Sequence, residues 1–382
     1  MKKIGFIGYG LRSETMMKAF ATLDADIEVS AIADPRSDEV KEKVASDKYF
    51  KNTAYYKDAD EMLSSAKFDG IFIGTRCSLH TPLACKVLKL NIPLFLEKPV
   101  CINEEQLSAL ALAGKGKENQ VVVSFPLRLS TIVLEMKRIV ESGVLGNITM
   151  VQAINNVPYG SVYYHSWYRD ENETGGLFLQ KTTHDIDYIQ FLLGERVTSA
   201  AAKTAKLYYK GDKPAGLKCE NCHEYRTCVE SSFTVKNILK EDVTGEYCCF
   251  AKDTGNEDVA SVIFTTQSGI IVSYNQNFIA KKSAARRGAR LIGTEGSAEF
   301  DFYTGEIRED RYLTPDTITH KFIFPAGAAH FGGDEKLALD FMSVLNGAPA
   351  KSNLYDGLAA AAACLAAKQA DKAGCFVPVT QF

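Results

Sequence analysis

Three short segments of this chain hold residues whose types and spacing suit chemistry: residues 8–13, 97–99 and 184–187. The first lies between an apolar run and an expected helix, where backbone N–H groups can approach a pyrophosphate. The second follows an apolar run and places a carboxylate and an ammonium at the carboxyl end of an expected strand, the edge at which doubly wound sheets bind ligands. The third adds an imidazole at the start of an amphipathic segment. Together they predict an enzyme that uses a nucleotide cofactor and takes its proton-transfer groups from two parts of the chain.

The glycine-rich turn has Gly8 and Gly10 in the first two positions of the G-x-G-x-x-G pattern and Ser13 in the third. A tight strand–helix turn with no ligand is the alternative interpretation, because the pattern alone is weak. Asp34 favours a dinucleotide, since it ends the second expected strand and can accept both ribose hydroxyls of NAD while repelling a 2′-phosphate. Arg36 could neutralise such a phosphate, so NADP remains the alternative to NAD. The candidate cofactor residues are Gly8, Gly10, Leu11, Arg12, Asp34, Arg36, Thr75, His80, Glu97 and Lys98.

Lys98 is the first candidate for proton transfer. A surface ion pair with Glu97 is the structural alternative, and such a pair would stabilise the fold little. A partly desolvated lysine beside a cofactor can instead hydrogen-bond a substrate hydroxyl and accept its proton. We therefore predict Lys98 to be catalytic.

His184 is the second candidate, one of only six histidines in the chain. A histidine at a helix start that bonds a backbone carbonyl is the alternative. Lys181 and Asp187 lie three residues to either side and Gln180 lies four before, so a helix that begins near Lys181 would place them on one face. This polar face predicts a lined pocket, with His184 and Lys181 as catalytic candidates and Trp167, Gln180 and Asp187 as substrate-binding candidates.

Composition indicates a globular protein of two domains. The chain has 382 residues, 46% of them hydrophobic and 24% charged, and a net charge of −3. That charge gives no basic field for nucleic acid, and no apolar run approaches the ~20 residues of a membrane helix. The first ten residues lack the apolar core and cleavage site of a signal peptide. Most of the ten cysteines lie in apolar segments, so we expect reduced thiols and a cytoplasmic protein.

The order of expected elements divides the chain near residue 125. Apolar strands at 3–7, 27–33, 53–56, 68–74, 92–96 and 121–125 alternate with helices at 14–23, 38–46, 58–65, 81–90 and 104–113. This alternation predicts an α/β fold with a parallel sheet covered on both faces, over residues 1–125. Residues 126–382 differ: strands at 148–154, 259–265 and 269–276, with helices at 130–142 and 184–193, predict a mainly antiparallel or mixed sheet covered on one face. An alanine-rich helix at 354–372 is expected to lie between the domains or against the sheet.

The chain resembles the Gfo/Idh/MocA oxidoreductases. The resemblance covers nearly the whole chain and is carried by residues 8–10, 97–99, 174–176, 184–188, 292–297 and 356–358. It implies an N-terminal Rossmann domain and a C-terminal α/β domain whose large open sheet forms a homo-oligomer, a dimer or tetramer. It also implies NAD(P)-dependent oxidation or reduction of a sugar, cyclitol or related polyol, with Lys98 and His184 matching the family's catalytic lysine and histidine.

One departure puts a simple transfer of that mechanism in doubt. Well-known members carry an aspartate four residues before the histidine, where this chain has Gln180, followed by Lys181. Glutamine can orient a hydroxyl but cannot accept a proton. Two alternatives therefore stay open: a glycoside-cleaving enzyme that oxidises its sugar transiently, and a non-catalytic NAD-binding sensor. The presence of both Lys98 and His184 argues against the sensor.

Two further clusters have open interpretations. Cys219, Cys222 and Cys228, with Cys248 about twenty residues later, are candidate ligands of a structural zinc, and free thiols are the alternative. Cys249 and His223 compete with Cys248 as the fourth ligand. The basic residues Lys281, Lys282, Arg286, Arg287 and Arg290 are typical of a solvated loop, with contact to an acidic substrate or a neighbouring subunit as the alternative.

Overall fold

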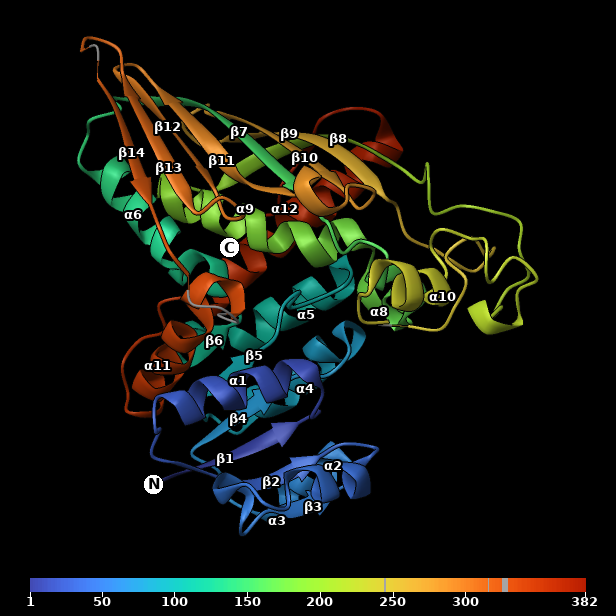
Figure 1. Ribbon diagram of the computed structural model, residues 1–382. Coiled ribbons are helices and arrows are strands. Elements are labelled where there is room, and N and C mark those ends of the chain that lie inside the picture. The colour runs from blue at the N-terminus through green and yellow to red at the C-terminus, as the bar shows by residue number, and fades with distance from the viewer. Residues whose placement is uncertain (244, 315, 325–328) are drawn as a thin grey trace.

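The computed structural model describes residues 1–243, 245–314, 316–324 and 329–382. It contains two sheets with helices between them: a six-stranded sheet built from the first third of the chain and a nine-stranded sheet built from the rest (Figure 1). The predicted α/β class is confirmed.

The first sheet is parallel throughout. Its strands are β1 (Lys2–Ile7), β2 (Ile27–Ala33), β3 (Ala54–Tyr56), β4 (Gly70–Ile73), β5 (Leu94–Leu96) and β6 (Val121–Val123), in the order β3-β2-β1-β4-β5-β6. The strands are apolar on both faces, so both faces need helical cover. This strand order is that of a Rossmann fold, in which ligands bind beyond the carboxyl ends of the strands.

The covering helices include one that the sequence pattern missed. The expected set is present as α1 (Leu11–Thr22), α2 (Ser37–Val44), α3 (Ala59–Ser65), α4 (His80–Lys89) and α5 (Glu104–Gly114). In addition α11 (Gly333–Leu345), from the C-terminal part, packs against α1. Phe341 of α11 meets Phe95 edge-on at 5.5 Å between ring centroids, and Phe95 stacks on Phe72 at 4.4 Å. The N-terminal layer is therefore completed by a segment more than 200 residues later.

The second sheet is large, mostly antiparallel and open. Its order is β14-β13-β12-β11-β7-β10-β9-β8-β15, and only the neighbours β7 and β10 run parallel among the described strands. The strands are β7 (Ile148–Asn156), β8 (Val197–Ala205), β9 (Val259–Thr266), β10 (Ile271–Asn277), β11 (Arg286–Gly293), β12 (Gly296–Asp301), β13 (Glu306–Arg311), β14 (Thr317–Lys321) and β15 (Val377–Pro378).

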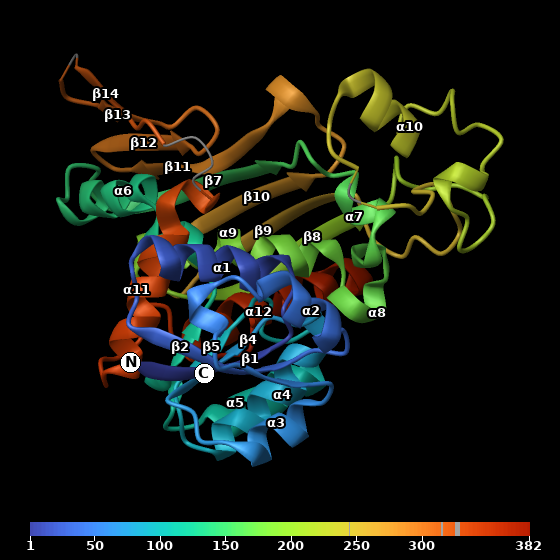
Figure 2. The ribbon, with the colours of Figure 1, turned by 60° about the horizontal axis from the view of Figure 1, so that its bottom comes forward.

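Three helices cover the inner face of this sheet: α6 (Thr131–Glu141), α9 (Leu177–Leu193) and α12 (Leu354–Ala373) (Figure 2). The alanine-rich α12 packs on α9 and β8 of the second sheet and also on α5 and β6 of the first. Its small side chains allow this close approach on several sides, and most of its residues are buried. The helix thus joins the two sheets.

The helix that carries His184 begins earlier than expected. Gly175 and Gly176 adopt φ values of +72° and +99°, and a Cβ on Gly175 would lie 2.7 Å from the carbonyl oxygen of Ile102. These glycines make the turn, and α9 starts at Leu177. His184 therefore lies two turns inside the helix and not at its start.

The segment between β8 and β9 forms a lobe at the side of the second sheet, seen at the right of Figure 1. It holds the short helix α10 (Ser232–Thr234) and packs near α7 (Val162–His165) and α8 (Glu171–Thr174). Among the described residues, no helix is long and apolar enough to cross a membrane.

Candidate active site

The three segments singled out from the sequence meet at one cavity. It has a volume of about 300 Å³ and lies between the carboxyl edge of the first sheet and helix α9. Its walls include most of the predicted site residues: Leu11, Arg12, Thr75, His80, Glu97, Lys98, Trp167, Gln180, Lys181 and His184. Leu11 and His184, which are 173 positions apart in the sequence, thus line one cavity.

The glycine turn leaves the N-terminus of α1 open. Gly8 has φ +80°, and a Cβ there would lie 2.8 Å from the Thr75 side chain and 2.9 Å from the Gly74 carbonyl oxygen. Gly10 precedes α1, no side chain caps the helix, and a Cβ on Gly10 would meet nothing within 4 Å. Leu11 is 81% exposed. The first N–H groups of a twelve-residue helix are therefore free to bind an anionic pyrophosphate.

Asp34 lies directly beside this turn, although it does not line the cavity. Its Oδ2 accepts the Tyr9 N–H at 2.9 Å and its Oδ1 accepts the Arg36 N–H at 2.8 Å. The Arg36 side chain also pairs with Oδ1 at 3.4 Å. The carboxylate is thus fixed at the place where a ribose would follow a pyrophosphate bound to the turn. These residues fit a dinucleotide.

Arg12 and Glu97 bond to each other across the cavity floor. Arg12 Nε donates to Glu97 Oε1 at 2.7 Å, and Arg12 Nη2 pairs with Asp334 Oδ1 at 2.6 Å. Asp334 in turn bonds His330 Nδ1 at 2.8 Å through its other oxygen. His330 lines the cavity with its ring centroid 6.0 Å from that of His184. Neither His330 nor Asp334 was expected from the sequence, where their only signal is the i, i+4 spacing across Phe331-Gly332-Gly333.

Lys98 reaches across from the first sheet to α9. Its Nζ donates to the backbone carbonyl oxygen of Gln180 at 2.7 Å. Burial, followed by the positive charge of Lys181, lowers the pKa of Lys98 to about 7. A lysine with that pKa is substantially neutral at neutral pH and can accept a proton.

Lys181 is a second buried lysine with a lowered pKa. It is 7% exposed, donates to the Tyr159 hydroxyl at 3.2 Å, and lies over the rings of Tyr159 and Tyr163 at 4.9 and 4.7 Å. Burial, followed by the charge of Arg287, lowers the pKa of Lys181 to about 7. The two amines compete for charge, because protonating one disfavours protonating the other.

His184 is neutral in this setting. It is 5% exposed, and burial, followed by the charges of Lys98 and Arg287, holds its pKa well below the usual range. Its Nδ1 is buried with no hydrogen-bond partner among the described residues. A neutral imidazole has one nitrogen that donates and one that accepts, so His184 can bond a substrate hydroxyl in either sense.

Arg287 supplies one of the positive charges that lower the pKa values of Lys181 and His184. It comes from the basic cluster expected to be a solvated loop, yet it lies on β11 and is 5% exposed. Its Nε donates to Asp185 Oδ1 at 2.8 Å, and Asp185 also accepts from Asn155 and from the Tyr274 hydroxyl, at 2.8 and 2.7 Å. The expectation of a solvated loop is wrong for Arg287, because the strand turns its side chain toward the buried face of α9.

His80, Trp167 and Gln180 are further predicted residues that line the cavity. His80 bonds the Pro99 and Thr75 carbonyl oxygens at 2.7 and 3.1 Å and so ties together two loops at the sheet edge. Trp167 stacks on Tyr168 at 3.9 Å between centroids, and Tyr163 and Tyr168 complete an aromatic wall that the sequence analysis did not include. The side-chain oxygen of Gln180 is buried without a partner among the described residues, so it can accept a bond from a ligand.

Asp187 does not reach the cavity. It is fully buried and accepts from Arg128 Nε at 2.9 Å, and Arg128 also bonds Asp356 at 2.7 Å. Asp356 begins α12, where it forms a capping box with Asn353. The sequence predicted that Asp187 would share the pocket-lining face of α9, but a buried arginine from another element occupies this position. Asp187 therefore connects α9 to α12 and does not face a substrate.

The cysteine cluster is not arranged as a metal site. Among the described residues, no group of three or more His, Cys, Asp or Glu side chains is placed to hold a metal ion. Cys219, Cys222, Cys228 and Cys248 are all free thiols. The Cys219 sulfur lies 3.6 Å from the Tyr247 carbonyl oxygen and 3.8 Å from His165 Nδ1. The structure gives the predicted structural zinc no support.

Both parts of the chain match domains of one known protein family. Residues 2–125 match the "Oxidoreductase family, NAD-binding Rossmann fold", and residues 133–299 match the "GFO/IDH/MocA C-terminal domain". The chain belongs to the Gfo/Idh/MocA oxidoreductase family. The protein YteT of Bacillus subtilis (strain 168) is 26% identical over 390 residues, which cover 89% of this chain and 88% of YteT. Myo-inositol 2-dehydrogenase of Thermotoga maritima is 25% identical over 203 residues, 52% of this chain and 57% of that protein.

Solved structures share the whole fold. A levoglucosan dehydrogenase in complex with NADH superposes with a TM-score of 0.78 and 18% identity, covering 100% of both chains. Myo-inositol 2-dehydrogenase from Lactobacillus plantarum gives a TM-score of 0.73 and 17% identity, covering 99% of both chains. At these identities the likeness is one of fold, and this family member is an NAD-binding oxidoreductase by its two matched domains.

Proposed function

We propose that this protein transfers a hydride between NAD and a CH–OH centre of a sugar, cyclitol or related polyol. The observation that carries this proposal is the single cavity in which Lys98, Lys181 and His184 lie next to an open glycine turn. The inositol and levoglucosan dehydrogenases among its relatives support a polyhydroxylated substrate.

The chain's own residues have defined roles in this proposal. The N–H groups that follow Gly10 bind the pyrophosphate and Asp34 bonds the ribose, which favours NAD over NADP. NAD held by these residues would supply the hydride acceptor, or the donor in the reverse direction. Lys98 in its neutral form accepts the hydroxyl proton, and His184 holds the same hydroxyl by a second hydrogen bond. Gln180 and Trp167 orient the substrate, through an amide oxygen and an aromatic face.

We also propose that residues 1–125 bind the cofactor and that residues 126–382 form the substrate domain and a homo-oligomer interface. The matched family domains, which meet near residue 125, support the division. On the uncovered face of the second sheet, Ile271 pairs in register with Met150, and Met150 with Ile292, giving an apolar row across three strands. Ile271 is 43% exposed, so a second copy packed on this row would bury it. Light scattering that finds a monomer would contradict the interface.

The test of the function is a substrate screen with NAD that follows both NADH absorbance and aglycone release. Hexoses, inositols and aryl glycosides form the panel. We expect NADH to accumulate with at least one polyol. Aglycone release without accumulated NADH would support transient oxidation instead, and calorimetry that detects no NAD binding would contradict the proposal.

A further inference from the structure

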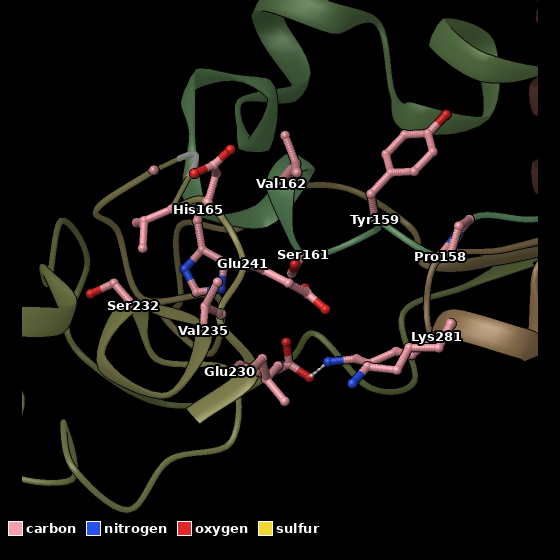
Figure 3. A pocket seen from close by; sticks show the side chains of 15 residues that line it. Pro158, Tyr159, Ser161, Val162, His165, Glu230, Ser232, Val235, Glu241 and Lys281 are labelled. Carbon is pink, nitrogen blue, oxygen red and sulfur yellow. Dashed lines mark hydrogen bonds and ion pairs between the residues drawn. The ribbon is translucent and has the colours of Figure 1, made fainter. Parts of the chain in front are cut away.

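A second cavity of about 340 Å³ lies beside the first and is not used by the mechanism above. One side is lined by Pro158, Tyr159, Ser161, Val162 and His165 (Figure 3). The other side is lined by the lobe between β8 and β9, and Lys281 and Lys282 also belong to the lining. We propose that this cavity binds a second sugar unit, so that the substrate is a disaccharide or larger glycoside. This inference rests on the proposed function.

Two residues that line this cavity, His165 and Glu230, each carry a buried acceptor atom. His165 is 6% exposed, and its Nδ1 must carry the ring proton because it lies 2.5 Å from the Tyr247 carbonyl oxygen, which can only accept. Its Nε2 is left as an acceptor with no partner among the described residues. Glu230 is 1% exposed, and its Oε2 also has no such partner. Both atoms are buried hydrogen-bond acceptors, and such groups are costly to leave without donors.

The other Glu230 oxygen is already bonded. Glu230 Oε1 accepts from Lys281, as the dashed line in Figure 3 shows, and from the Tyr208 hydroxyl at 2.8 Å. The Lys281 ammonium therefore balances the carboxylate charge, so the site does not require a cation. An anion would meet the carboxylates of Glu230, Glu241 and Asp242.

Neutral hydroxyl groups satisfy this arrangement best. Each sugar hydroxyl can donate to His165 Nε2 or Glu230 Oε2 while accepting from the Ser161 or Ser232 hydroxyl on the same walls. The Tyr159 ring adds an aromatic surface of the kind that packs against the apolar face of a sugar.

The two cavities share a wall. Tyr159 lines the second cavity, and its hydroxyl accepts from Lys181, which lines the first. On the short helix α7, Val162 and His165 line the second cavity while Tyr163 lines the first. A unit bound beside Tyr159 therefore lies next to a side chain that lines the reacting pocket, and a disaccharide whose linkage passes Tyr159 would occupy both cavities.

The test measures sugar binding to the protein loaded with NADH, by titration calorimetry. Glucose is compared with cellobiose and maltose, and xylose with xylobiose. Ser232→Phe places a bulky side chain in the second cavity, and Asn221→Phe is the matched control, because Asn221 is exposed on the same lobe and does not line the cavity.

We expect at least one disaccharide to bind about ten-fold or more tightly than its monosaccharide. Ser232→Phe should abolish that advantage, and Asn221→Phe should retain it. Equal binding of every pair, or an advantage that survives Ser232→Phe, overturns the second sugar site. NADH formation from the same sugars is measured in parallel: turnover without a disaccharide advantage overturns only this inference, whereas no turnover of any carbohydrate overturns the proposed function as well.

Discussion

Lys98 and Lys181 are both buried, and we expect one substitution to shift the pH dependence of kcat/KM. Lys98 and Lys181 each have a pKa lowered to about 7, and the charge of Lys181 is the second cause, after burial, of the lowering at Lys98. Lys181→Met removes that charge and keeps a side chain of similar length. The pKa of Lys98 should then rise, because its ammonium no longer faces a second cation.

The magnitude follows from the protonation equilibrium of Lys98. Loss of one neighbouring cation is expected to raise its pKa by about one unit, or ~1.4 kcal/mol. At pH 7 the neutral fraction of Lys98 would fall from about one half to about one tenth, so kcat/KM should fall about five-fold for this reason alone. Above pH ~9 Lys98 is mostly neutral in both proteins, and this loss should disappear.

The assay is kcat/KM measured from pH 5.5 to 10 on the substrate found by the screen. For the native protein the rate should rise with pH around 7, since Lys98 loses its proton there, and for Lys181→Met the midpoint should move to more alkaline pH. Lys181→Arg holds a positive charge across the whole pH range, so its midpoint should not move to more alkaline pH. The surface control Lys203→Met, at a side chain that is 80% exposed, should keep the native midpoint. An unchanged midpoint in Lys181→Met would refute the coupling, whatever happens to the height of the profile.

Two further predictions concern the cofactor and the fold. NAD should bind at least about ten-fold more tightly than NADP, because Asp34 repels a 2′-phosphate; calorimetry that finds equal or tighter NADP binding would show that Arg36 dominates. Asp187→Ala should lower the free energy of unfolding by about 3–5 kcal/mol, since it leaves Arg128 buried with one partner fewer, and should leave NAD affinity unchanged. Denaturant unfolding checks this, and a normal stability with a raised KM would instead place Asp187 at the substrate.

The parts of the site that the sequence revealed are those with a local signature. The glycine turn, residues 97–99 and His184 follow strands or lie on a helix whose apolar pattern is visible in the sequence, and parallel strands bring their carboxyl ends to one edge. The position of Lys98 at a common cavity with Leu11 and Arg12, which follow the glycine turn, agrees with that rule.

The parts that the sequence did not reveal depend on contacts between distant segments. Nothing in the pattern of residues 329–345 shows that α11 returns to the first sheet, that His330 lines the cavity, or that Asp334 bonds Arg12 and His330. Helical spacing predicted Asp187 on the pocket-lining face of α9, but spacing cannot show that Arg128 binds Asp187 away from the cavity. The burial of Arg287 likewise depends on its strand partner and not on its charged neighbours in sequence.

The central claim is that Lys98 and His184 act together on one substrate hydroxyl, and a double-mutant comparison tests it most directly. Lys98→Ala, His184→Ala and the double variant are compared for NAD affinity by calorimetry and for turnover of the substrate. We predict that NAD affinity stays within a few-fold, that each single change lowers turnover by about 10²–10⁴, and that the double variant loses far less than the product of the two. Near-normal turnover in both single variants would contradict the claim and make Lys181 the next candidate, and loss of NAD binding in both would show that these residues position the cofactor instead.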